Sequence, residues 1–209
     1  MNLSTADELR EIYRTPGAAA AGKSRTSIDE ASARFIGRAP LVMLATASAA
    51  GHCDVSPRGG PPGFVTVLDD THVAIPDLGG NNRLDSLQTV VENPQAGLLF
   101  LIPGLDDTLR INGPATITTA DDVLDRHHPE LRRPKSALVV ETRELFVHCA
   151  KAFRRSRAWR PDTWAAALAD APDLVEIVTC QFAIDDREAL RDDLEQDYVA
   201  ELSAERAER

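Results

Sequence analysis

The spacing of apolar residues divides the chain into a helical start, a central stretch of short strands and a helical end. Residues 6–14 and 27–36 carry apolar positions at helical spacing, and Ser27 with Glu30 predicts an N-cap for a helix that includes Ile28. From residue 41 onward, short apolar runs alternate with turn residues. They predict strands over 41–46, 52–55, 63–68, 72–75, 97–102, 108–112, 115–119, 137–141 and 144–147.

A single helix over residues 83–91 interrupts these strands, and the chain beyond Cys149 has helical character throughout. Short strands leave unpaired edges unless the sheet curls, so we predict a mainly β, antiparallel, barrel-like fold with flanking helices. The expected parts are a helical extension packed on the barrel (residues 1–40), the barrel (41–160) and a C-terminal helical segment (161–209). In that last segment a leucine and tyrosine stripe at spacings of four, from Leu190 to Leu202, predicts a helix that packs one face on the body.

Charge and composition narrow the classes of function. Lys and Arg number 23 against 33 Asp and Glu, a net charge of −10 that repels phosphate backbones, so nucleic acid is not an expected partner. No apolar run is long enough to span a membrane, and residues 1–14 lack the apolar core of a signal peptide. Three isolated cysteines fit a reducing cytoplasm better than a disulfide framework.

Residues 17–24 match the phosphate-binding pattern Gly-x-x-x-x-Gly-Lys-Ser letter by letter. That chemistry needs a buried strand before the loop and a helix that starts at the Lys-Ser pair. Here a charged helix precedes the loop, and the next helix is expected only near Ser27. We therefore interpret the segment as an alanine-rich linker.

Two clusters carry residues suited to a bound anion. The segment 54–64 is dense in glycine and proline and predicts a shaped loop, whose amides, Ser56 hydroxyl and Arg58 guanidinium suit an anionic or ring-carbonyl ligand. The segment 77–87 runs through a Gly-Gly turn into a helix with Arg83 in its first turn. A cation is unfavourable there unless an anion neutralises it, and phosphate is the simplest anion.

Each cluster also has a plainer explanation. The first could be a wide hairpin with an incidental arginine, and in the second Asn81 or Asn82 could simply cap the helix. A third segment, 148–160, places five bases and Trp159 close together. It suits a small phosphorylated aromatic, or it is a solvated basic helix. No group of side chains has the spacing of a metal site, and no catalytic residue is assigned.

These clusters, in this order, resemble the FMN-dependent branch of the pyridoxamine 5′-phosphate oxidase-like superfamily, with the closest likeness to a bacterial subgroup. The matching stretches are 54–64, 75–87, 93–104, 109–115 and 148–159. The resemblance implies a split β-barrel that forms a homodimer, with FMN in two clefts at the subunit interface. The residues that it implies for the cofactor are Ser56, Pro57, Arg58, Gly59, Asn82, Arg83, Ser86, Leu87, Arg110, Lys151, Arg154 and Trp159.

The implied activity is that of an FMN-dependent oxidoreductase that passes a hydride or electrons through the flavin to a small molecule. The alternative is a carrier or sensor that only binds flavin, haem or a deazaflavin. The chain departs from the authentic oxidases at Ser56–Gly60, where they carry an Arg and a Leu-Leu-Lys strand, and it lacks their C-terminal motif. Oxidation of vitamin B6 is therefore not expected.

Overall fold

A single antiparallel sheet with an open path forms the body of the protein in the computed structural model, which describes residues 2–207. Its strands are β1 (Leu41–Ala47), β2 (Cys53–Gly59), β3 (Thr66–Val67), β4 (His72–Pro76), β5 (Gln95–Leu101), β6 (Thr108–Thr118), β7 (Ala137–Glu141) and β8 (Glu144–His148). They pair in the order β2-β1-β5-β6-β7-β4-β3, and β8 pairs with β6. The predicted antiparallel, mainly β fold is confirmed, and the sheet is split because β2 and β3, at the two ends of the path, do not pair with each other.

Strand β6 belongs to both halves of this split sheet. Residues 108–112 pair with β8 and, in part, with β5, whereas residues 115–118 pair with β7. The prediction of two strands separated at Gly113-Pro114 is therefore wrong, because one strand continues through both residues. A Cβ atom at Gly113 would lie 1.8 Å from the Glu141 carbonyl oxygen, so only glycine permits this close approach of two backbones.

The segment predicted as a loop over residues 54–64 is also different in the structure. Strand β2 continues to Gly59, opposite Leu41 of β1, and the loop begins only at Gly60. Pro57 lies opposite Met43. A proline is tolerated there because β2 is an edge strand, whose outer side makes no ladder hydrogen bonds.

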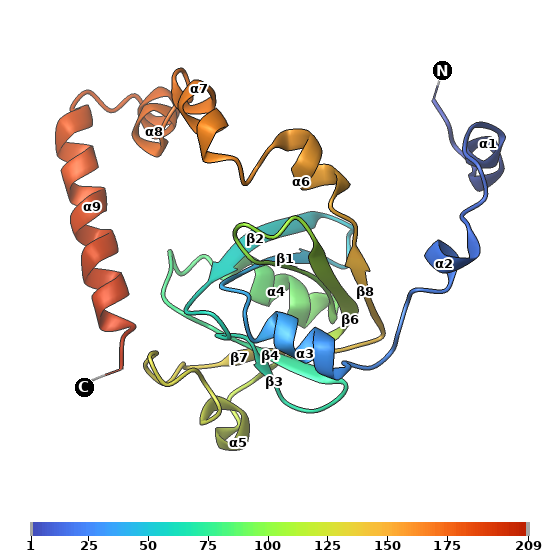
Figure 1. Ribbon diagram of the computed structural model, residues 1–209. Helices are drawn as coiled ribbons and strands as arrows, with labels where there is room; N and C mark the ends of the chain where they lie inside the picture. Colours follow the sequence, from blue (N-terminus) through green and yellow to red (C-terminus); the bar gives the residue numbers. More distant parts are fainter. Residues whose placement is uncertain (1, 208–209) are drawn as a thin grey trace.

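Two helices pack on the sheet and close the core. Helix α3 (Glu30–Ile36) buries Ile36, and helix α4 (Asp85–Glu92) packs on β1, β2 and β6 and buries Val90 (Figure 1). The N-cap of α3 is Asp29, which accepts a hydrogen bond from the Ser32 amide, and not Ser27 as predicted. Ile28 precedes the helix and still enters the core.

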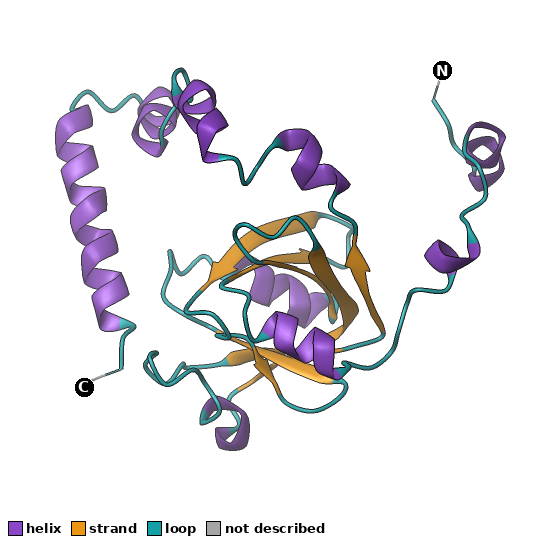
Figure 2. Cartoon of the chain, in the orientation of Figure 1, coloured by secondary structure: helices purple, strands orange, loops and turns teal. Residues whose placement is uncertain are grey.

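The other helices lie around the body or extend from it (Figures 1 and 2). They are α1 (Ala6–Ile12), α2 (Ala18–Ala21), α5 (Asp121–Leu124), α6 (Lys151–Ser156), the short 3₁₀ helix η1 (Pro161–Thr163), α7 (Trp164–Leu168), α8 (Leu174–Phe182) and α9 (Arg187–Ala204). Helices α1, α2 and α9 bury no side chain, so the predicted packing of the α9 stripe on the body is wrong. Residue 1 and residues 208–209 of the predicted terminal segments lie outside the described range.

The alanine-rich segment does not form a phosphate loop. Residues 18–21 form the exposed helix α2, and within residues 2–17 the chain forms helix α1 and no strand. In the described part of the chain, no helix combines the length and apolar character needed to cross a membrane.

Replacing Gly113 by alanine tests the crossing of β6 over the β7–β8 turn. Since the new methyl group would meet the Glu141 carbonyl, we expect Gly113→Ala to lower the free energy of unfolding by about 3 kcal/mol or more, measured by urea denaturation. Gly17→Ala, where the added Cβ meets nothing, is the matched control and should change it little. Equal stability of the two variants would contradict the proposed steric constraint.

Candidate functional site

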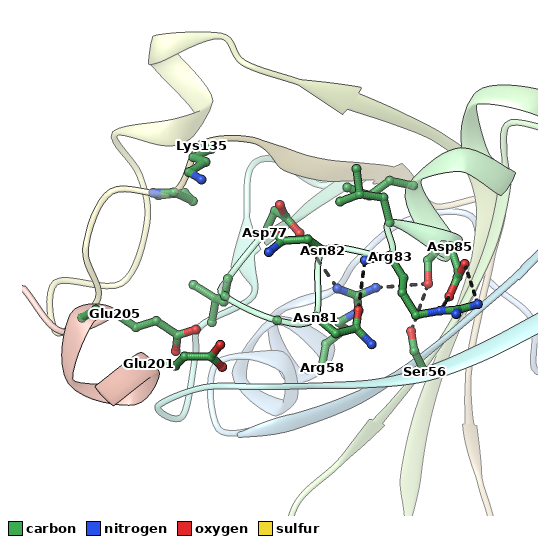
Figure 3. Close-up of a pocket in the computed structure, with 18 of the residues that line it drawn as sticks. Ser56, Arg58, Asp77, Asn81, Asn82, Arg83, Asp85, Lys135, Glu201 and Glu205 are labelled. Carbon is green, nitrogen blue, oxygen red and sulfur yellow. Dashed lines mark hydrogen bonds and ion pairs between the residues drawn. The ribbon is translucent and has the colours of Figure 1, made fainter. Parts of the chain in front are cut away.

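A cavity of about 490 Å³ lies between β2 and the connection that follows β4. Ser56 and Arg58 of β2 line it on one side, and the connection from β4 to the first turn of α4 lines another (Figure 3). Residues 132–135 and the last turn of α9 complete the wall. Ser56, Arg58, Asn82, Arg83, Ser86 and Leu87, which the sequence predicted for a cofactor, all line this one cavity.

A buried serine organises the polar groups at the inner end of the cavity. Ser86 is only 2% exposed, and its hydroxyl donates to the Asp54 carboxylate at 2.6 Å. The same oxygen lies 3.1 Å from the Ser56 hydroxyl and accepts a hydrogen bond of 3.1 Å from Arg58 Nη2. Residues 54, 56 and 58 alternate along β2, so their side chains share one face of the strand and meet α4 together.

Arg58 keeps unused hydrogen-bonding capacity at this position. Its side chain is 28% exposed, and its Nη1 atom lies 4.0 Å from the Asp77 carboxylate, at the outer limit of an ion pair. Its Nε atom is buried and has no hydrogen-bond partner among the described residues. A buried donor without a partner costs free energy, and an anion in the cavity is the kind of group that would remove this cost.

The connection before α4 differs from its prediction. The helix begins at Asp85, after two left-handed residues, Asn82 and Leu84, so Arg83 lies outside the helix and its side chain is 70% exposed. Arg83 Nε donates to the Asp85 carboxylate at 2.8 Å, and this hydrogen bond raises the pKa of Arg83. The expectation of an unneutralised cation in the first helical turn is therefore wrong.

Neither asparagine caps the helix. The Asn81 side chain accepts a hydrogen bond from the Arg83 amide, and Leu84 occupies the N-cap position without a side-chain hydrogen bond. The N-terminus of α4 is thus left without a side-chain cap at the wall of the cavity. Uncapped amides at a helix N-terminus favour negatively charged groups.

The remaining predicted residues do not line this cavity. Pro57 and Gly59 lie on the other face of β2, which is exposed. Arg110 forms an ion pair of 2.8 Å with Glu144, and Arg154 pairs with Asp106. Lys151 begins α6, and Trp159 stacks on Phe153 beside the same helix. The structure therefore divides the predicted residues into one group at the cavity and another on β6 and around α6.

Sequence reasoning missed the cavity wall formed by residues 132–135 and the end of α9. The wall contains three cations, Arg132, Arg133 and Lys135, and two carboxylates, Glu201 and Glu205. The Arg-Arg-Pro-Lys run was a visible signal, since three cations so close together are unusual in an acidic chain. Nothing local indicated that the C-terminal helix returns to this place.

A second polar cluster lies at the opposite edge strand, β8. The Lys23 ammonium lies 4.2 Å from the centre of the Phe146 ring, and the Arg110 guanidinium lies 4.1 Å from it. The His148 ring packs against Phe146 at 4.9 Å. Partial burial, followed by the charges of Arg110 and Lys23, lowers the pKa of His148, so this imidazole loses its proton more readily than a free histidine.

The described part of the chain holds no cluster of side chains that could bind a metal ion. Within residues 2–207, no three or more His, Cys, Asp or Glu side chains come together in a way that could hold a metal ion. His52 and Cys53, adjacent at the start of β2, gain no third ligand from the described part of the chain.

The fold and the cavity define a split-barrel protein with a polar cavity suited to an anionic ligand. The family model described as pyridoxamine 5′-phosphate oxidase matches residues 28–149, more than half of the 209 residues. The chain belongs to this family. No curated protein matches the chain.

Several solved structures resemble this chain. HupZ from Group A Streptococcus is 19% identical over 57% of this chain and 93% of that one, with a TM-score of 0.45. An FMN-binding protein from Syntrophomonas wolfei is 12% identical over 56% and 84% of the two chains, with a TM-score of 0.42. A pyridoxamine 5′-phosphate oxidase-related, FMN binding protein from Nostoc punctiforme is 14% identical over 56% and 81%, with a TM-score of 0.40.

The position of Lys23 beside Phe146 can be tested by titrating His148. Because the Lys23 charge lowers the pKa of His148, we expect Lys23→Ala to raise that pKa toward its usual value, as measured by NMR titration of the imidazole. Arg10→Ala, on the exposed helix α1, removes the same charge elsewhere and should leave the titration unchanged. An unaltered His148 pKa in Lys23→Ala would show that the Lys23 ammonium does not lie beside Phe146 and His148 of β8.

Proposed function

We propose that the protein is a cytoplasmic, homodimeric FMN-dependent oxidoreductase that holds the phosphate of FMN in the cavity between β2 and α4. The observation that carries this proposal is the buried, unpartnered Nε of Arg58 beside the Ser56–Ser86 pair. Membership of the pyridoxamine 5′-phosphate oxidase family supports the same ligand class. Free, exposed Cys53, Cys149 and Cys180 are consistent with a reducing compartment.

The donor set suits a phosphate group. Arg58 supplies a guanidinium that the Ser86 hydroxyl already positions, and the uncapped start of α4 supplies backbone amides. Arg83 can contribute only by exchanging its hydrogen bond with Asp85 for one with the ligand. We therefore assign Arg58 the larger share of phosphate binding.

The second group of predicted residues completes the site in the proposed dimer. Arg110, Lys151, Arg154 and Trp159 do not line the cavity of their own subunit, so a partner subunit would have to bring them to the cofactor. The apolar side chains of Val55 on β2 and Val147 on β8 are both more than half exposed. Their burial against a second copy would supply part of the association free energy.

FMN, when bound, supplies hydride or electron transfer at its ring system. The protein's part is to bind and orient. The Asp54–Ser86–Arg58 network fixes one face of β2 before any ligand arrives, so little ordering remains to be done on binding. A cation such as Lys151 beside the ring would stabilise negative charge there, and no side chain is assigned a proton-transfer role.

The absorbance spectrum of the purified protein tests the proposal first. We expect a yellow preparation with a flavin band, bleaching by NADH or NADPH, and reoxidation with turnover when an acceptor is added. Bleaching without turnover would indicate a carrier, and a Soret band would indicate haem. A colourless protein that binds no added FMN would overturn the proposal.

Substitution of the two arginines tests which one holds the phosphate. We expect Arg58→Ala to weaken FMN binding by about 1.5–3 kcal/mol, the usual cost of a lost charge-assisted hydrogen bond. Arg83→Ala should cost less than about 1 kcal/mol, because this exposed side chain is already paired. Riboflavin, which lacks the phosphate, should bind both variants as it binds the unmodified protein. A similar loss of riboflavin affinity in Arg58→Ala would contradict a phosphate role.

A further inference from the structure

The end of helix α9 covers one side of the cavity, although the helix is poorly attached to the body. None of its side chains is buried, and Tyr198 and Leu202 remain 48% and 60% exposed. Its end is held by backbone contacts and by the Arg132 guanidinium, which donates to the Ala204 carbonyl at 3.4 Å. The Arg132 amide donates to the Glu205 carbonyl at 2.6 Å, and the Ala207 amide donates to the Glu130 carbonyl at 3.1 Å. A segment held in this way opens at low free-energy cost compared with the core.

Two carboxylates reach the cavity from this helix end. Glu201 and Glu205 lie one turn apart, so they share a face of α9, and both line the cavity that Arg58 lines (Figure 3). Among the residues that the structure describes, neither carboxylate belongs to an ion pair, and Arg132 in the same wall already has a partner. A Cβ on Gly79 would lie 2.7 Å from Glu205 Oε1, so this carboxylate contacts the β4–α4 connection directly.

These carboxylates conflict with the ligand proposed above. A phosphate dianion at Arg58 would share one cavity with the carboxylates of Glu201 and Glu205, and like charges in one cavity repel. The repulsion is relieved either by weaker binding or by movement of the helix end. Movement is the easier outcome, because the end of α9 is attached by a few exposed hydrogen bonds and not by buried side chains of the helix.

We propose that the last turn of α9 is a displaceable acidic lid, whose docking on residues 130–132 competes with the phosphate of the bound ligand. This inference rests on the proposed function of the cavity. It assigns a regulatory role to the acidic C-terminal helix, because anything that draws α9 away strengthens ligand binding. The competition is reciprocal, so the ligand also weakens docking of the lid by the same factor.

Neutralising the two carboxylates in the full chain tests the lid. We expect Glu201→Gln with Glu205→Gln to tighten FMN binding by about fivefold for each carboxylate at low ionic strength, and by less at high salt. Riboflavin affinity should not change, since riboflavin carries no phosphate. Glu188→Gln with Glu195→Gln, on the same helix and away from the cavity, makes the same change in net charge and should leave FMN affinity unaltered.

Hydrogen exchange gives a readout of the lid itself. We expect saturating FMN to accelerate exchange of the Arg132 and Ala207 amides in the unmodified protein, because both amides bond only when the lid is docked. Unchanged exchange together with equal FMN affinity in the two double variants would overturn the lid while the FMN site stands. Failure of every variant to bind FMN would overturn the proposed function, and the lid with it.

Discussion

The close approach of β6 to the turn between β7 and β8 is the constraint on which the rest of the structure depends. Around Gly113 one strand ends its pairing with β8 and then begins to pair with β7, while β5 pairs with it through Pro114. There is no space for a side chain at Gly113, where the strand crosses the β7–β8 turn. The crossing joins the two halves of the sheet in one strand. Strands β2 and β3 are the two ends of the path and do not pair with each other, and the cavity lies where β2 approaches the connection that follows β4.

Within that cavity, a hydrogen-bonded serine decides what the surrounding charges can do. Ser86 binds Asp54, Ser56 and Arg58 at once, so the guanidinium is positioned before a ligand arrives. The cost of this arrangement is the buried Nε of Arg58, which has no partner in the described chain. Arg83, by contrast, is exposed and satisfied by Asp85, although the sequence alone made it the more conspicuous cation.

Charge balance distinguishes this cavity from a simple anion site. Arginines from β2 and from the segment before β7 share the cavity with carboxylates from β2, from the residues between β4 and α4 and from the end of α9. In a chain of net charge −10, a ligand with a phosphate gains affinity only where cations outweigh their acidic neighbours. The carboxylates at the end of α9 shift that balance, and because α9 buries no side chain, movement of the helix would adjust it.

The sequence by itself determined the antiparallel, mainly β class, most strands, the helical end and the family, because hydrophobic period and short motifs are local properties of the chain. It misjudged Ser56–Gly59 as a loop and Gly113-Pro114 as a break, because proline and glycine signal turns locally, while an edge strand and a strand crossing accept them for reasons of packing. Which cation is buried, and which helix end meets the cavity, depended on residues far apart in the chain. Only the tertiary structure decided those, because the contacts between Ser86 and Asp54, and between Glu205 and Arg132, form only when distant parts of the chain pack together.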